Sequence, residues 1–167
     1  MAELVTYRTT DLVTTITMDD GKVNVFSIPM LHALHEAFDD AERDGTVVLL
    51  TGRPGCFSAG FDLKALAGPP DDAVTLLRLG ATLAERVLSF PAPVAVACTG
   101  HAFPAGAFLL MAADTRVGAD GPISQASTRA GGAPEPPGPP TPGAGILLDH
   151  RPWTAGVTPV TNVAWFG

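Results

Sequence analysis

The stretch Phe57–Lys64, with the sequence Phe-Ser-Ala-Gly-Phe-Asp-Leu-Lys, combines residue types that suggest chemistry. It follows an apolar run, Val47–Leu50, and a group of turn-forming residues, Thr51–Gly55. This order predicts a buried strand, a tight loop and the beginning of a helix. Ala and Gly in such a loop leave backbone N–H groups open to a ligand, and N–H groups at the start of a helix bind anions. We therefore expect an oxyanion-binding site at this stretch.

The segments around this stretch alternate between strand and helix patterns. Strands are expected at Leu12–Met18, Thr46–Thr51, Val94–Cys98 and Thr115–Val117. Helices are expected from Ser27 to Gly45, from Asp71 or Asp72 to Pro91, and from Ala105 to Ala113. Strands that alternate with helices are typical of an α/β fold.

The first two helices show apolar residues at helical spacing. In the first, Ser27 is the expected N-cap and Gly45 the end, because Ser caps helices and Gly terminates them. Its predicted buried face is Leu31, Leu34, Phe38 and Ala41. For the second helix, the predicted buried face is Val74, Leu77, Ala81, Ala84 and Leu88, with Asp71 or Asp72 as the cap.

The eight residues from Phe57 closely resemble a motif of the enoyl-CoA hydratase/isomerase (crotonase) superfamily, F-[SA]-A-G-x-D-[LI]-[KR]. Two flanking segments, Gly21–Ser27 and Pro91–Gly100, are also similar to family segments. The resemblance extends from about Val13 to Gly121. It implies an incomplete crotonase-like α/β spiral of ββα units.

The resemblance also implies a reaction, in which two backbone N–H groups stabilise the enolate of an acyl-CoA thioester. The position of the first donor corresponds to Ala59 and that of the second to Ala105. In the second motif, Pro104 and Ala105 replace two of the family's three glycines. A helix N-terminus offers a free N–H, so Ala105 can serve if it does not require a positive φ.

A pocket for the CoA thioester is implied as well. Its residues by resemblance are Lys22, Val23, Phe61, Asp62, Leu63 and Lys64. Five of the six have an alternative interpretation: the two lysines as solvated surface residues, Phe61 and Leu63 as core, and Asp62 as a helix cap. Asp114 is expected to be structural.

The acid/base residues of the hydratases are not present. Where the hydratases carry a glutamate, this chain has Phe108, which cannot transfer a proton. The second glutamate belongs to a part of the family fold that we do not recognise after Gly121. The chain is therefore expected to be either a hydratase/isomerase-family enzyme of another subclass or an inactive truncated member that at most binds acyl-CoA.

The composition changes after Gly121. Residues 122–167 contain nine of the 16 prolines, and this density of Pro opposes both helix and central strand. We expect two parts, a crotonase-like domain at 1–121 and a disordered tail at 122–167 that is either out of frame or a genuine interaction segment. A non-enzymatic interaction protein that uses the Pro-rich tail is a further alternative.

The charge and the cysteine content indicate which kinds of partner and site to expect. The chain of 167 residues has a net charge of −7, which disfavours nucleic-acid binding. Cys56 and Cys98 are expected to be free thiols, and no Cys/His cluster has metal-site spacing. No signal peptide or membrane span is evident, so a cytoplasmic protein is expected. No cofactor is expected because CoA is part of the substrate, and the family usually forms trimers or dimers of trimers.

Overall fold

A five-stranded sheet forms the centre of the computed structural model, which describes residues 3–118. The strand order is β1-β2-β4-β7-β9, with β1 paired antiparallel to β2 and the other neighbours parallel. The strands are β1 (Val5–Thr10), β2 (Val13–Met18), β4 (Val47–Thr51), β7 (Val94–Cys98) and β9 (Thr115–Gly118). The four strands expected from the sequence are all present, whereas β1 was not expected.

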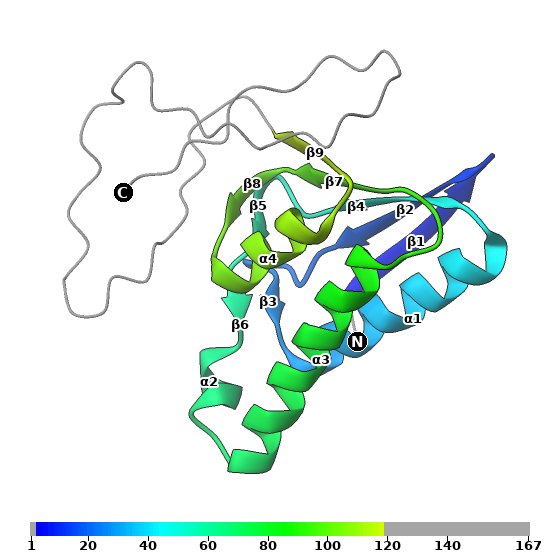
Figure 1. Cartoon of the computed structure of the whole chain (residues 1–167). Coiled ribbons are helices and arrows are strands. Elements are labelled where there is room, and N and C mark those ends of the chain that lie inside the picture. The colour runs from blue at the N-terminus through cyan, green and yellow to red at the C-terminus, as the bar shows by residue number, and fades with distance from the viewer. Residues whose placement is uncertain (1–2, 119–167) are drawn as a thin grey trace.

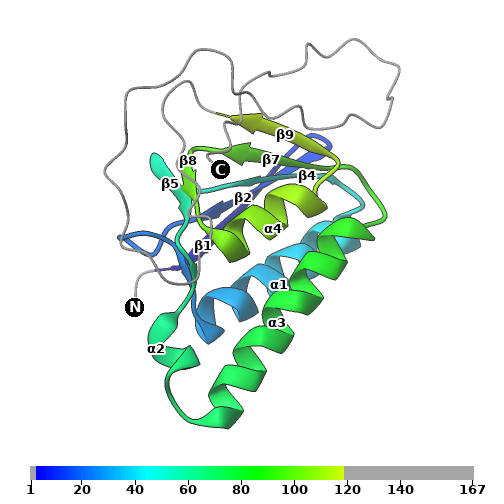
Figure 2. The same ribbon diagram turned by 60° about the vertical axis from the view of Figure 1, so that its left-hand side comes forward.

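Three helices lie on one side of this sheet, as Figures 1 and 2 show. They are α1 (Ile28–Asp44), α3 (Pro70–Leu88) and α4 (Pro104–Ala112). The long helices α1 and α3 run side by side, and α4 packs against α3. The core between them and the sheet is fully buried at Ile16, Phe38 and Leu50. Within residues 3–118, no helix has the length and apolarity that crossing a membrane requires.

Two short pairs of parallel strands and one short helix lie outside the five-stranded sheet. β3 (Val25–Phe26) pairs with β6 (Gly60–Phe61), and β5 (Gly55–Ser58) pairs with β8 (Gly100–Ala102). The helix α2 (Leu63–Leu66) follows β6. This mixture confirms the expected α/β class for residues 3–118, whereas the tail expected at 122–167 lies outside the described residues.

The prediction for α1 is confirmed at both ends and on its buried face. The Ser27 hydroxyl accepts a hydrogen bond from the Met30 N–H at 3.3 Å, and Gly45 ends the helix in the left-handed conformation with φ of 65°. Leu31, Leu34 and Phe38 are completely buried. Local capping and tertiary burial therefore agree along this helix.

The prediction for α3 is wrong at its start and on its buried face. The helix begins at Pro70 after Pro69, so Asp71 and Asp72 lie in its first turn and neither is the cap. Its buried residues are Leu76, Leu83 and Val87. In the predicted face, Val74, Leu77 and Leu88 are exposed. Apolar residues occur around most of this helix, so periodicity alone did not identify the side that packs against α1.

Candidate active site

The two segments expected to bind an oxyanion come together in the fold. Gly60 has a φ of 82°, and a Cβ added to it would lie 3.5 Å from the Ala105 amide nitrogen. The turn at Gly60 therefore contacts the first turn of α4. Glycine suits this position because the left-handed conformation strains other residues.

Ser58 connects the segments around this contact. Its hydroxyl accepts a hydrogen bond from the Gly60 N–H at 3.0 Å and donates one to the Asn24 carbonyl at 2.7 Å. Its carbonyl accepts the Phe103 N–H at 2.9 Å. Because Ser58 is fully buried, these three bonds fix the loop before β3, the turn before β6 and the start of α4 relative to one another.

Ala105 lies in the first turn of α4, as expected. Pro104 is the first helical residue, and the first intrahelical bond runs from the Ala107 N–H to the Phe103 carbonyl at 3.0 Å. The N–H of Ala105 thus has no acceptor within the helix. Ala105 is not among the described non-glycine residues with positive φ, so the replacement of glycine by alanine leaves the backbone unstrained.

Ala59 is placed differently from the prediction. Its N–H donates to the Val23 carbonyl at 2.9 Å, so in this structure it is engaged within the fold and is not directed at a ligand. The Asp62 N–H donates to Phe26 in β3 at 3.2 Å. Because successive residues of a strand direct their N–H groups to opposite sides, the Phe61 N–H points away from β3. The positive φ at Gly60 shifts this alternation, which the sequence motif alone did not reveal.

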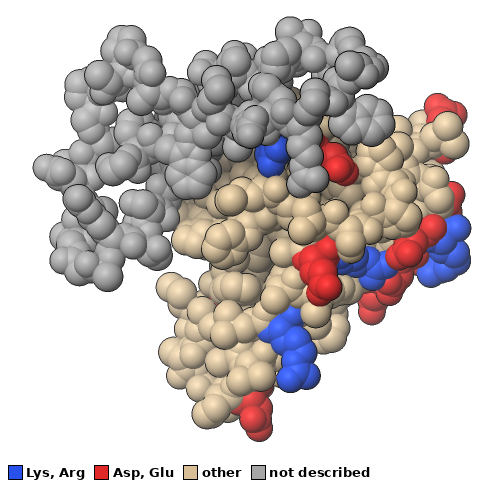
Figure 3. Space-filling model, in the orientation of Figure 1, with Lys and Arg blue, Asp and Glu red and all other residues tan. Residues whose placement is uncertain are grey.

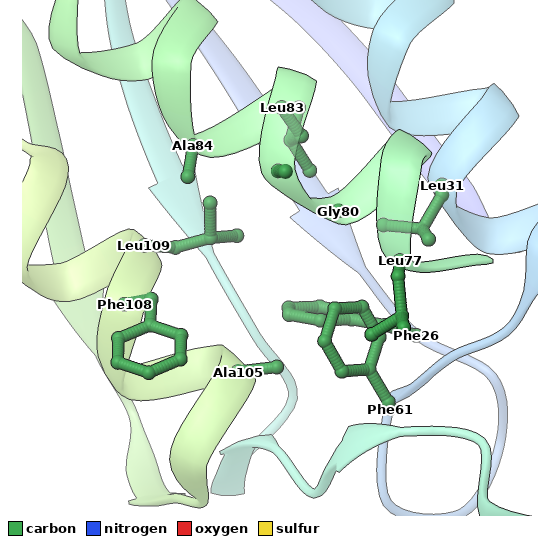
Figure 4. Close-up of a pocket in the computed structure, with 11 residues that line it drawn as sticks. Phe26, Leu31, Phe61, Leu77, Gly80, Leu83, Ala84, Ala105, Phe108 and Leu109 are labelled. Carbon is green, nitrogen blue, oxygen red and sulfur yellow. The ribbon is translucent and has the colours of Figure 1, made fainter. Parts of the chain in front are cut away.

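An apolar cavity of about 360 Å³ adjoins both segments (Figure 4). It lies between α3, α4 and the β3–β6 pair, and both Phe61 and Ala105 line it. The lining residues are Phe26, Leu31, Phe61, Leu77, Gly80, Ala81, Leu83, Ala84, Ala105, Phe108 and Leu109. None of them has an ionisable side chain. Phe108, which stands where hydratases were expected to carry a glutamate, is therefore at the wall of the cavity.

The other residues predicted for the CoA pocket do not line this cavity. Lys22 and Lys64 are exposed, as are Val23 and Leu63. The Asp62 carboxylate accepts the Lys64 N–H at 2.9 Å and caps α2. Asp62 thus has the capping role that was its alternative interpretation, and Phe61 alone of the six lines the cavity.

Asn24 is a buried residue at the site that sequence reasoning did not single out. It adopts a φ of 53°, and its amide nitrogen donates to the carbonyls of Met18 at 3.0 Å and Phe57 at 3.2 Å. It therefore holds the loop before β3 against β5. The sequence feature that could have indicated this role is a single Asn in a predicted loop, because Asn tolerates the left-handed conformation.

The Asp20 carboxylate organises the same loop. It accepts the backbone N–H groups of Lys22 at 2.7 Å, Asn24 at 2.9 Å and Val25 at 3.1 Å. Burial by itself raises the pKa of Asp20, but these three hydrogen bonds and the nearby Arg53 outweigh it and lower the pKa below its usual value.

Asp114 and the two cysteines have structural environments. The Asp114 carboxylate accepts the Val94 N–H at 2.9 Å, which agrees with the structural role expected for it. Cys98 is buried and Cys56 half-buried, and both are free thiols as predicted. Burial is also the main cause of the raised pKa of each thiol. Among residues 3–118, no group of His, Cys, Asp and Glu side chains is arranged to hold a metal ion.

Comparison with known proteins identifies the family to which this sequence and fold are similar. The family model described as enoyl-CoA hydratase/isomerase matches residues 8–138, which is further than the expected end of the resemblance at Gly121. An enoyl-CoA hydratase/isomerase family protein from Pseudomonas syringae superimposes with a TM-score of 0.71 at 47% identity, over 73% of this chain and 53% of that one. An enoyl-CoA hydratase from Mycobacterium ulcerans gives a TM-score of 0.67 at 48% identity, over 68% of this chain and 51% of that one. The described fold is thus crotonase-like, as expected.

Curated relatives agree with the structural neighbours. A probable enoyl-CoA hydratase of Bacillus subtilis is 34% identical over 65% of this chain and 43% of its own length. A trans-2-decenoyl-[acyl-carrier-protein] isomerase of Streptococcus mutans is 31% identical over 96% of this chain and 61% of its own length. The chain spans about half the length of the relatives that it matches. Taken with the convergence of the two predicted segments, the family match establishes that this chain belongs to the enoyl-CoA hydratase/isomerase family.

Proposed function

We propose that this chain binds an acyl-CoA thioester, with the acyl group in the apolar cavity and the thioester oxygen at the backbone amides beside it. The observation that carries the proposal is the contact between the Gly60 turn and the Ala105 amide at the edge of this cavity. Backbone N–H groups that are fixed before the ligand arrives stabilise the charge of an enolate most strongly.

The two proposed donors are the N–H groups of Ala105 and Phe61. Ala105 is retained from the sequence prediction, because its N–H has no acceptor within α4. Phe61 takes the place of Ala59, because the Ala59 N–H is bonded to the Val23 carbonyl and the Phe61 N–H points away from β3. Both residues line the cavity.

The described cavity offers space for an acyl group but no side chain that could transfer a proton. A hydratase adds water with the help of acid/base groups, and no lining residue of the described cavity is ionisable. Phe108 occupies the position at which, by the family resemblance, the hydratases carry a glutamate. We therefore propose that the chain as given binds acyl-CoA and polarises the thioester without hydrating an enoyl-CoA.

Titration of crotonyl-CoA into the purified protein tests this proposal. Binding should be detectable by calorimetry, while the absorbance of the enoyl thioester should stay constant. Ala105→Pro removes one donor in the first helical turn, where proline is tolerated, and should weaken binding about fivefold through the loss of one hydrogen bond.

The thermal unfolding midpoint of the Ala105→Pro variant serves as its control for folding. Absence of binding by the wild-type chain would contradict the proposed function. Hydration by the wild-type chain that Ala105→Pro abolishes would instead identify it as an active enzyme. Equal affinity of the two proteins would exclude Ala105 as a donor.

A further inference from the structure

A glycine in the interior of α3 contacts the ring of Phe61. Gly80 lies in the middle of the helix Pro70–Leu88, where glycine is less stable than alanine. A Cβ added to Gly80 would lie only 2.4 Å from both Cε1 and Cζ of Phe61. Because Gly80 has no side chain, the Phe61 ring can pack directly against the backbone of α3.

The Phe61 ring has a fixed neighbour on its other side. It meets the ring of Phe26 edge to face, with centroids 6.4 Å apart and planes at 72°. Phe26 is buried in the close-packed core with 2% of its surface exposed, so its ring has little room to move. A ring that is pushed away from α3 must therefore move toward the open side, which is the cavity.

Figure 4 shows how these residues divide the cavity wall. Phe61, Phe26 and Leu77 lie on the side of Gly80, and Phe108 and Ala105 lie across from them on α4. Phe61, Ala105 and Phe108 all line the cavity, so an acyl chain that extends into it from the Ala105 amide meets the Phe61 ring. The position of the Phe61 ring therefore limits the length and width of the acyl chain.

We propose that Gly80 is a specificity-determining residue, which keeps the Phe61 ring against α3 and so admits a longer apolar acyl chain. The inference rests on the proposed function, because it assumes that the acyl group occupies this cavity. The ligand class is an uncharged, apolar acyl group, since all eleven lining residues are apolar or glycine.

A set of three variants tests the proposal: Gly80→Ala, Phe61→Ala and the two combined. Calorimetry gives the affinities of each for butyryl-CoA and decanoyl-CoA, two saturated probes that differ in chain length. Gly80→Ala should weaken decanoyl-CoA about tenfold relative to butyryl-CoA, because the displaced ring occupies space that the longer chain would fill. Phe61→Ala keeps the backbone N–H and should favour decanoyl-CoA.

The combined variant is the matched control. Without the ring, Gly80→Ala has nothing to displace, so the added methyl group should leave the chain-length ratio of Phe61→Ala unchanged. An unchanged ratio in Gly80→Ala alone would overturn the proposal. A penalty of equal size with and without the Phe61 ring would overturn it as well.

Butyric and decanoic acids provide a second measurement that does not depend on the CoA group. If the wild-type chain binds the fatty acids but not the acyl-CoA probes, the proposed function fails while the inference about Gly80 is still decided by the acid series. Absence of binding in both series would overturn both proposals.

Discussion

Ser58 joins three segments of the candidate site, and both hydrogen bonds of its hydroxyl are buried. The Ser58→Ala variant leaves the Gly60 N–H and the Asn24 carbonyl without their partner. An unsatisfied buried group costs about 1–3 kcal/mol, so we expect the free energy of unfolding to fall by about that amount. Urea denaturation monitored by circular dichroism measures it.

Ser89→Ala is the matched control for this prediction. The Ser89 hydroxyl donates to the Glu85 carbonyl at the exposed end of α3, where water can replace it, so this change should cost much less. If the two variants lose equal stability, the buried bonds of Ser58 do not hold the site together.

At this scale, the sequence predicted which segments form the site better than which atoms do. The octapeptide and the start of α4 were both expected, and they meet at Gly60 and Ala105. The motif alone did not indicate that the Ala59 N–H is bonded to the Val23 carbonyl within the fold. Backbone direction in a turn depends on pairing with β3, which is distant in the sequence.

At the scale of the elements, the conformation of the loop that connects β2 to β3 depends on the carboxylate of Asp20. Asp20 has a lowered pKa in the folded chain, so the folded state binds its proton less tightly than the unfolded state does. Its stabilising contribution is therefore fully present above the unfolded pKa of about 3.9 and is lost as the pH falls through the lower folded value. Asp20→Asn should cost about 1 kcal/mol at pH 7 and much less at about pH 2.

Urea denaturation of both proteins at the two pH values checks this prediction. Glu36→Gln, a change at an exposed position of α1, is the control for a general effect of charge. A stability difference between Asp20→Asn and wild type that stays constant with pH would show that the Asp20 charge does not organise the loop.

The two long helices show what sequence patterns can predict about an element. In α1 the caps and the apolar spacing point to the same face, and Ser27, Gly45 and Leu34 all have the expected roles. In α3 the exposed Leu77 belonged to the predicted face and lines the cavity, whereas its neighbour Leu76 is buried and does not line it. A helix with two apolar sides, one for the core and one for a cavity, has no single preferred face in its sequence.

At the scale of the whole molecule, the described residues 3–118 have an apolar face around the cavity. In Figure 3, uncharged surface predominates over α4, and charged side chains are interspersed along α3. Large apolar side chains are exposed there at Leu77, Phe108 and Met111. The chain spans about half the length of its relatives, and exposed apolar patches of this kind mark interaction surfaces.

We propose that the folded unit nonetheless ends near Gly121. Within residues 3–118, β9 pairs with β7 and ends at Gly118, and the core residues of α1 and α3 are already buried. A chain that ends at Gly121 should therefore keep the urea midpoint of the full chain, because it loses none of this buried surface. A chain that ends at Gly138, the limit of the family match, is the comparison. If ending at Gly121 lowers the midpoint while ending at Gly138 does not, residues 122–138 stabilise the fold, and the boundary lies where the family match ends.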